Sequence, residues 1–214
     1  MSPSPGSRRG PAAPRQACLP YSSTPDVPFC AGSMVRTAAN LIARSVVAEV
    51  GHAGHMEDPG PTREAGPRRS RPEEARYLAD LWLRSRQASI PAIPPPVHPA
   101  SDARAWFAEV VVPTKEVWLI EEADIPVALL VLDGDWIDQL YVEPDHAGRG
   151  FGSRLLVLAK ELRPAGLDLW TFESNHGARR FYERHGFEAV GMTVGDNEED
   201  APDVHYRWHD PATS

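Results

Sequence analysis

Hydrophobic and polar positions in the C-terminal two thirds of the chain predict six strands. The segments with this character are 116–122, 125–133, 136–142, 167–172, 187–194 and 204–208. They are rich in β-branched, aliphatic and aromatic residues, which favour strands. Ala123-Asp124 between the first two suits a hairpin turn, and Asp133-Gly134-Asp135 suits the next turn. An acidic loop, residues 195–203, separates the last two strands.

Four further segments have a helical pattern, namely 72–87, 101–111, 151–162 and 176–185. In the first, Ala75, Leu78, Ala79 and Trp82 fall on one apolar face after an acidic first turn. We expect Ser101 to cap the second helix. Pro164 and Gly166 end the third helix, and Gly186 suits a left-handed cap on the fourth.

The order of these elements predicts one mixed α/β domain over residues 71–209, followed by a short tail, 210–214. The composition predicts a disordered N-terminal extension over residues 1–70, because residues 1–33 are rich in Pro, Ser, Gly and Arg. Within it, residues 34–50 have the pattern of a short helix. One hypothesis is that the functional protein starts near Met56, and another is that residues 34–50 dock a partner.

Charge and composition exclude several classes of protein. Residues 1–70 carry a net charge of +3 and residues 71–214 a net charge of −11, which does not suit binding to nucleic acid phosphates. No apolar run is long enough for a membrane helix. The two cysteines, Cys18 and Cys30, lie in the extension, so neither a secreted disulfide framework nor a metal site is expected. We expect a cytoplasmic protein without a metal.

Three glycines at alternate positions, Gly148, Gly150 and Gly152, lie between a predicted strand and a predicted helix. The unpaired amides of a first helical turn favour an anion, and glycines let the backbone approach it closely. The dinucleotide pattern G-x-G-x-x-G is excluded because Ser153 occupies its last position, and no G-K-[ST] of a nucleotide-binding P-loop is present. The alternative is a tight turn whose glycines serve packing alone.

Two motifs resemble the GNAT superfamily of acetyl-CoA-dependent N-acetyltransferases. The loop AGRGFG, residues 147–152, is similar to that family's pattern Q/R-x-x-G-x-G/A, with Ala147 in place of Gln or Arg. Residues 175–187 are similar to its later motif N-x-x-A-x-x-F-Y-x-x-x-G-F. The matching residues there are Asn175, Ala178, Phe181, Tyr182, Gly186 and Phe187. The resemblance covers about residues 71–209, although its first strand is represented only by the short, charged PRRSRP.

The resemblance implies a central, mostly antiparallel, splayed sheet flanked by helices. Acetyl-CoA would lie as co-substrate in a gap between the strands ending at Val142 and Phe172. Leu140, Tyr141 and Val142 would pair with the pantetheine arm like an added strand. The pyrophosphate loop would comprise Ala147, Gly148, Arg149, Gly150, Phe151, Gly152 and Ser153. Asn175 would lie near the pantetheine, and it is equally well placed to cap the helix that starts at 176.

In the family, the tyrosine that matches Tyr182 protonates the departing CoA thiolate, which is work that a phenol within reach of the sulfur can do. The alternative is that Tyr182 belongs to the core. The base that deprotonates the amine is not named by the sequence. Asp138 and Glu173 are equal candidates, and Asp138 alternates in phase with Trp136 and Leu140, which predicts partial burial and a raised pKa.

The sequence thus predicts an N-acetyltransferase that moves an acetyl group directly to a primary amine of a small molecule or peptide. No cysteine lies in the domain to carry an acyl intermediate. A catalytically inactive CoA-binding sensor or interaction module with the same fold is the alternative. Residues 82–95 are expected to form one wall of the acceptor pocket, and the acidic loop could approach the amine. A homodimer is left open.

Overall fold

The computed structural model of this protein describes residues 66–210. The predicted helix at 34–50, the hypothesis of a start near Met56 and the two cysteines lie outside the described residues. The first described strand, Arg68–Arg69, precedes the start at residue 71 that the sequence pattern predicts for the domain. Within residues 66–210, no helix is both long enough and apolar enough to cross a membrane.

A seven-stranded sheet in the order β1-β2-β3-β4-β5-β7-β6 forms the centre of the domain. Every neighbouring pair is antiparallel except β4 and β5, which confirms the mixed, mostly antiparallel sheet predicted from the sequence. The strands are β1 Arg68–Arg69, β2 Glu116–Glu122, β3 Ile125–Asp133, β4 Trp136–Val142, β5 Leu167–Phe172, β6 Glu188–Val194 and β7 Pro202–Trp208.

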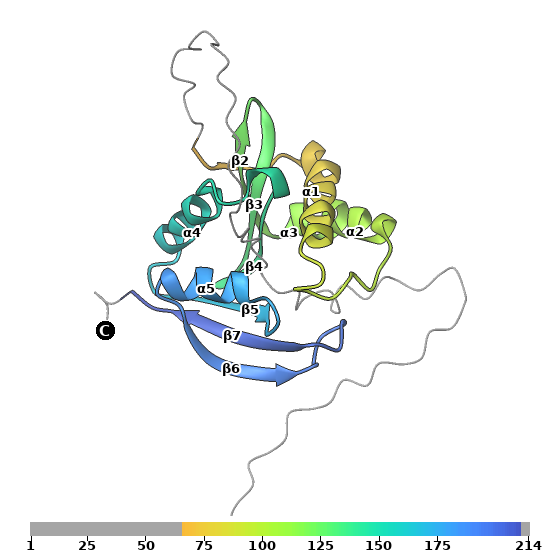
Figure 1. Ribbon diagram of the computed structural model, residues 1–214. Helices are drawn as coiled ribbons and strands as arrows, with labels where there is room; N and C mark the ends of the chain where they lie inside the picture. The colour runs from red at the N-terminus through yellow and green to blue at the C-terminus, as the bar shows by residue number, and fades with distance from the viewer. Residues whose placement is uncertain (1–65, 211–214) are drawn as a thin grey trace, which may run out of the picture. The chain divides into compact units, whose positions relative to one another are not determined.

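Helices cover both sides of the sheet. In Figure 1, α1, α2 and α3 lie on one side of β2, β3 and β4, α4 lies on the other side, and α5 lies over β5 and β7. The helices are η2 Pro72–Glu74, α1 Ala75–Ala88, α2 Ala100–Trp106, η3 Phe107–Val111, α3 Val112–Thr114, η4 Pro144–His146, α4 Phe151–Leu162 and α5 His176–Arg184. Each layer buries its own hydrophobic core against the sheet.

The core on the α1 side confirms the apolar face predicted for this helix. Ala75, Leu78, Ala79 and Trp82 are all buried, and Leu81 joins them. Trp82 packs against the rings of Trp106, Phe107 and Tyr141 with centroids 6.2 to 6.3 Å apart. This aromatic cluster fixes α1 and α2 against β4, which is the strand that carries much of the predicted site.

The hairpin turns follow the predicted turn chemistry. Ala123 and Asp124 have φ of 50° and 63°, so both occupy the left-handed region that a tight two-residue hairpin turn requires. Gly134, with φ of 58°, begins the turn between β3 and β4. These short turns bring β2, β3 and β4 into one continuous antiparallel ladder.

Ser101 does not cap the second helix, so this prediction is wrong. The helix begins at Ala100, and its N-cap is Pro99, whose backbone is extended. The amide of Asp102 donates to the carbonyl of Pro99, so the chain has already turned into the helix before Ser101. The hydroxyl of Ser101 instead donates to the carboxylate of Asp102, which lies one residue further along.

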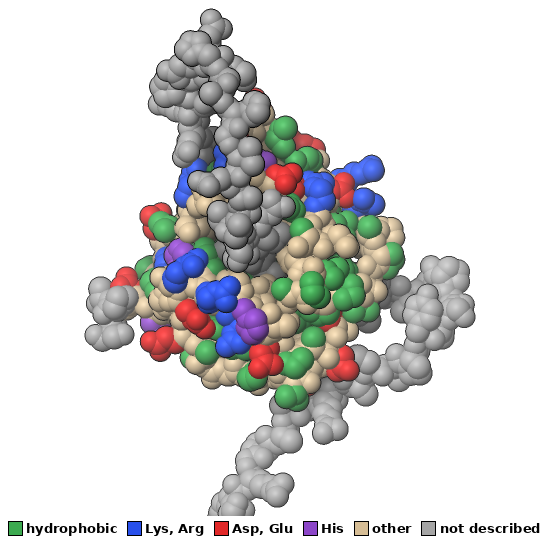
Figure 2. Space-filling view, viewed as in Figure 1, with side chains coloured by type: hydrophobic (Ala, Val, Ile, Leu, Met, Phe, Trp, Pro, Cys, Tyr) green, Lys and Arg blue, Asp and Glu red, His purple; other side chains and the backbone are tan. Residues whose placement is uncertain are grey.

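The surface of the domain is uneven in character. Figure 2 shows hydrophobic side chains gathered over α2 and the connector between α1 and α2, whereas charged side chains are scattered over the rest of this face. In that connector Ile90 is 36% exposed and Val97 is 57% exposed. The apolar region therefore includes Ile90, which belongs to the segment 82–95 that is expected to form one wall of the acceptor pocket.

Candidate functional site

β4 and β5 separate shortly after they meet. The two parallel strands are paired at Trp136 and Asp168, and the amide of Asp168 donates to the carbonyl of Asp135 over 3.0 Å. No further register pair joins them within the described chain. On its other edge β4 stays paired with β3 as far as Val142, opposite Ala128. The predicted gap between the two strands is therefore present, and the segment 140–142 borders it.

The glycine loop connects the end of β4 to the start of α4. Gly148 and Gly150 have φ of 80° and 86°, and an added Cβ at either position would meet no heavy atom within 4 Å. Packing therefore does not explain these two glycines, although their left-handed backbone does favour glycine. The open space beside them leaves room for a ligand to contact the bare backbone.

The first turn of α4 supplies the polar groups of this loop. Gly150 is the N-cap, and its carbonyl accepts the first helical hydrogen bond from the amide of Arg154. The amides of residues 151–153 precede that bond and lie at the positive end of the helix dipole. Open space, left-handed glycines and a helix N-terminus together fit a pyrophosphate.

The side chains of the loop are directed elsewhere. The guanidinium of Arg149 pairs with the carboxylate of Glu122 and lies 5.3 Å from the ring of Phe151, which is itself buried. The hydroxyl of Ser153 lies 3.1 Å from Nε2 of His185, the residue that follows α5. Ala147 is extended and carries no polar side chain. The loop thus offers an anion its backbone, while its side chains hold the loop in place.

Asn175 is a helix cap. Its side-chain oxygen accepts a hydrogen bond of 3.0 Å from the amide of Ala178, at the start of α5. The residue is buried at the end of the turn between β5 and α5. Of the two roles that the sequence analysis left open, the capping role is confirmed, and the pantetheine contact stays a prediction.

Tyr182 lies on the buried face of α5. Its ring contacts those of Phe181, Phe187 and Tyr206, with centroids 5.2, 5.6 and 6.4 Å apart. Burial raises the pKa of Tyr182 well above its ordinary value, and the neighbouring Tyr141 phenol on β4 raises it further. The side chain is therefore a phenol at neutral pH, and it can donate a proton but not accept one as a phenolate.

Asp138 does not share a face with Leu140, so the phase predicted for these two residues is wrong. Ile137 pairs with Leu132, and Gln139 pairs with the next residue, Val131, so Asp138 is the extra residue of a β-bulge. The bulge turns Asp138 toward α3, whereas Leu140 packs in the core on the α4 side. The alternating pattern of the strand could not reveal this shift.

The burial predicted for Asp138 is nevertheless found. The residue is 7% exposed, and burial raises the pKa of its carboxyl despite the opposing effect of the Lys115 ammonium. Nζ of Lys115 lies 3.0 Å from Asp138 Oδ2 and 3.2 Å from Asp133 Oδ2. Glu173 lies in different surroundings, beyond the end of β5, where its amide donates to the carbonyl of Pro202.

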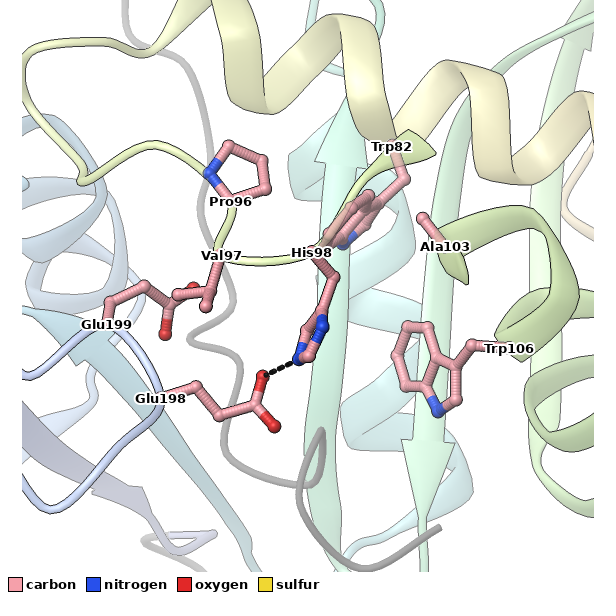
Figure 3. Close-up of a pocket in the computed structure, with 8 residues that line it drawn as sticks. All are labelled: Trp82, Pro96, Val97, His98, Ala103, Trp106, Glu198 and Glu199. Carbon is pink, nitrogen blue, oxygen red and sulfur yellow. Dashed lines mark ion pairs between the residues drawn. The ribbon is translucent and has the colours of Figure 1, made fainter. Parts of the chain in front are cut away.

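A small pocket opens between three segments that are far apart in the sequence. Its walls come from α1, from α2 with the connector before it, and from the loop between β6 and β7 (Figure 3). The cavity measures about 20 Å³ and is lined by Trp82, Pro96, Val97, His98, Ala103, Trp106, Glu198 and Glu199. The acidic loop thus meets Trp82 at this pocket, and Trp82 is the one lining residue from the segment 82–95 that was predicted as an acceptor wall.

The pocket lies beside the gap between β4 and β5. The indole of Trp82 donates to the side-chain oxygen of Gln139 on β4 over 2.9 Å. On the opposite wall, Glu199 accepts from Arg86 over 2.7 Å, and the Arg86 guanidinium lies 5.9 Å from the ring of Phe172, the last residue of β5. One wall is thus connected to each of the diverging strands.

His98 and Trp106 of the pocket, and Arg86 behind Glu199, were not predicted as site residues from the sequence. His98 and Glu198 are a hundred positions apart, and no local period or motif connects them. Trp82 was assigned to the core, which is correct but incomplete, because it also forms a wall of the pocket. No group of three potential metal ligands occurs within residues 66–210.

Comparisons with known proteins identify the family of this chain. A family model described as an acetyltransferase (GNAT) domain matches residues 113–189, which include β2 to α5. The peptidyl-lysine N-acetyltransferase YjaB of Salmonella typhimurium is 33% identical over 134 residues, covering 61% of this chain and 88% of that protein. The Escherichia coli protein of the same name is 31% identical, covering 61% of this chain and 86% of that protein.

The fold agrees as well. The solution structure of apo-form YjaB from Escherichia coli aligns with a TM-score of 0.56 at 28% identity, covering 67% of this chain and 96% of that one. The residues matched by the family model, 113–189, include the diverging strands, the glycine loop and the helix that carries Tyr182. On the strength of the family model and of a relative matched along nearly its whole length, the chain belongs to the GNAT family of N-acetyltransferases.

Proposed function

We propose that this N-acetyltransferase takes its acetyl group from acetyl-CoA and transfers it directly to a primary amine of a small molecule or peptide. The observation that supports acetyl-CoA as the donor is the loop between β4 and α4. There, Gly148 and Gly150 expose bare backbone to open space at a helix N-terminus. A pyrophosphate is an anion suited to that geometry, and it is part of CoA.

The remaining contacts to the donor follow from the gap between the strands. Leu140, Tyr141 and Val142 border the gap on β4, where an extended pantetheine arm could add to the strand edge. The amides of residues 148–153 would hold the pyrophosphate, and Asn175 would lie near the pantetheine. A donor made inside the cell is consistent with the cytoplasmic location that the sequence predicts, and a homodimer stays a prediction.

Tyr182 is our proposed acid. Attack of the amine on the acetyl carbonyl forms a C–N bond and breaks the C–S bond, and the sulfur leaves as a thiolate. The phenol of Tyr182 gives its proton to that sulfur and regains one from the nitrogen that has become an amide. The raised pKa of Tyr182 keeps the phenol protonated but also makes it a weaker acid, so this role rests on its match to the family motif and not on its pKa.

A lysine side chain is the acceptor that we favour. The relatives named above are peptidyl-lysine acetyltransferases, and the pocket combines indole walls with two glutamates. Indole faces and carboxylates both attract an ammonium group. The cavity of about 20 Å³ has room for a group of the size of one water molecule, which is also the size of an ammonium head.

The test is acetyl transfer to a peptide that carries one lysine and has both ends blocked. With acetyl-CoA and the full chain, we expect the peptide to gain the mass of one acetyl group on the lysine while free CoA thiol appears. The matched control is the same peptide with norleucine at that position, which should remain unmodified. Binding of acetyl-CoA without transfer to any amine would instead favour the inactive CoA-binding module.

A further inference from the structure

Direct transfer requires a group that removes a proton from the acceptor ammonium, and this inference therefore rests on the proposed function. The two carboxylates named from the sequence fit that task poorly. Asp138 is 7% exposed and is held by Lys115 on the α3 side of the sheet. Glu173 lies beyond the end of β5, and neither residue lines the pocket.

His98 lines the pocket and points into it. Figure 3 shows its imidazole between the indoles of Trp82 and Trp106 on one side and Glu198 on the other. Nε2 of the ring lies 3.3 Å from Oε2 of Glu198, and the two side chains are 38% and 20% exposed. The ring is thus reachable from solvent and lies within ion-pair distance of a carboxylate from a different segment of the chain.

The second ring nitrogen of His98 is free to act. Within residues 66–210, Nδ1 has no hydrogen-bond partner, whereas Nε2 faces Glu198. Because the carboxylate lies on the Nε2 side of the ring, Nδ1 is the nitrogen left to accept a proton from a bound ammonium. A base oriented by a third group is the arrangement that activates nucleophiles in many enzymes.

Of the charged groups around the imidazole of His98, one carboxylate faces the ring. The β6–β7 loop brings Glu198 and Glu199 to the pocket, and α1 brings Arg86 behind Glu199. Glu199 is paired with Arg86, so Glu198 is the carboxylate that faces the imidazole. The α2 wall contributes only Ala103 and Trp106, which carry no charge.

We propose that His98 is the general base of the transfer and that Glu198 is its positioning residue. Nδ1 of His98 takes one proton from the acceptor ammonium, and the neutral amine then attacks the acetyl carbonyl. The second proton lost by the nitrogen goes to the CoA sulfur through Tyr182, and His98 returns its own proton to solvent. Two protons leave the nitrogen and both are accounted for, without any further reactant.

The experiment measures kcat and KM against pH for the lysine peptide, with wild type, His98→Gln and Glu198→Gln. We expect His98→Gln to lower kcat by on the order of 10²-fold and to remove the limb of the profile in which rate rises with pH. Glu198→Gln should lower kcat less and shift that limb. Acetyl-CoA binding, measured by calorimetry, should be unchanged in both variants.

Two controls separate catalysis from folding. Added imidazole should restore part of the activity of His98→Ala, which a purely structural defect would not allow. His209→Gln changes an exposed histidine away from the pocket and should retain the wild-type profile. An active His98→Gln with an unchanged kcat and pH profile would overturn this inference alone. Absence of transfer by the wild type would overturn the proposed function and this inference with it.

Discussion

The guanidinium of Arg86 and the carboxylate of Glu199 form an ion pair of 2.7 Å, although 113 positions separate them in the chain. Both side chains are nearly inaccessible, with 1% and 8% exposure. Arg86 also lies 5.0 Å from the ring of Trp82, and its Nε and Nη1 have no hydrogen-bond partner in the described chain. This pair ties the acidic loop that carries Glu198 to α1 and so holds the pocket together.

Arg86→Met should therefore destabilise the fold and loosen the acidic loop. The methionine keeps much of the side-chain volume but leaves the buried carboxylate of Glu199 without its partner. Such a loss costs about 3 kcal/mol in the free energy of unfolding. Urea unfolding measures the loss, and amide hydrogen exchange should show faster exchange in residues 195–201.

The double variant Arg86→Met/Glu199→Gln is the control for that experiment. Because no buried charge is left unpaired, we expect it to recover most of the stability lost in the single variant. Equal losses in the single and double variants would show that the ion pair is not what Arg86 contributes.

Lys115→Met should destabilise the protein in a pH-dependent way. Burial raises the pKa of Asp138 in the folded state, and the Lys115 ammonium is the main group that opposes this effect. Without it, the folded-state pKa of Asp138 rises further. Urea unfolding of the wild type and Lys115→Met between pH 4 and pH 7 measures this effect. The difference in the free energy of unfolding should be small near pH 4 and grow to about 3 kcal/mol at pH 7.

The raised pKa of Asp138 sets the direction in which stability changes with pH. A carboxyl whose folded pKa lies above its unfolded value of about 3.9 stabilises the fold below that value. This contribution is lost as pH rises through the folded pKa. Lys115→Met/Asp138→Asn, which lacks the buried carboxylate, should show no such growth with pH. A difference between wild type and Lys115→Met that is constant with pH would contradict the account.

Tyr182→Phe should lower kcat on the order of 10²-fold because the thiolate loses its proton donor. The affinity for acetyl-CoA should not change. Since burial raises the pKa of Tyr182, the wild-type kcat should also not decline as pH approaches the ordinary tyrosine value of about 10. Steady-state kinetics with the lysine peptide measure both effects.

Tyr206→Phe is the matched control, since it removes a phenol from a ring 6.4 Å away that hydrogen-bonds to Glu183 instead. Its kcat should stay close to that of the wild type. Equal losses in the two variants would mean that Tyr182 serves the core rather than the chemistry.

Much of the fold could be predicted from local pattern. The strands 116–122, 125–133, 136–142 and 167–172 match to the residue, because apolar runs end at turns whose chemistry is specific. The helix 151–162 also matches, bounded by Gly150 and Pro164. The glycine loop was found for the same reason, since its signal lies within a few consecutive residues.

What the pattern missed depends on contacts between distant segments. The bulge at Asp138 is set by its pairing with β3, and the residues on either side are compatible with an unbroken strand. The start of the second helix depends on the backbone of Pro99 rather than on the best capping side chain. The approach of His98 to Glu198 results from packing of the connector against the β6–β7 loop, which one sequence cannot show.

The most direct measurement is acetyl-CoA binding by calorimetry for wild type, Gly150→Ala and Gly134→Ala. Both glycines have positive φ and open space where a Cβ would lie, so each substitution should cost about 1 kcal/mol of stability. Only Gly150 lies in the proposed pyrophosphate loop. We expect micromolar binding that Gly150→Ala weakens at least about tenfold and that Gly134→Ala leaves intact. No binding by the wild type, or equal binding by all three proteins, would contradict it.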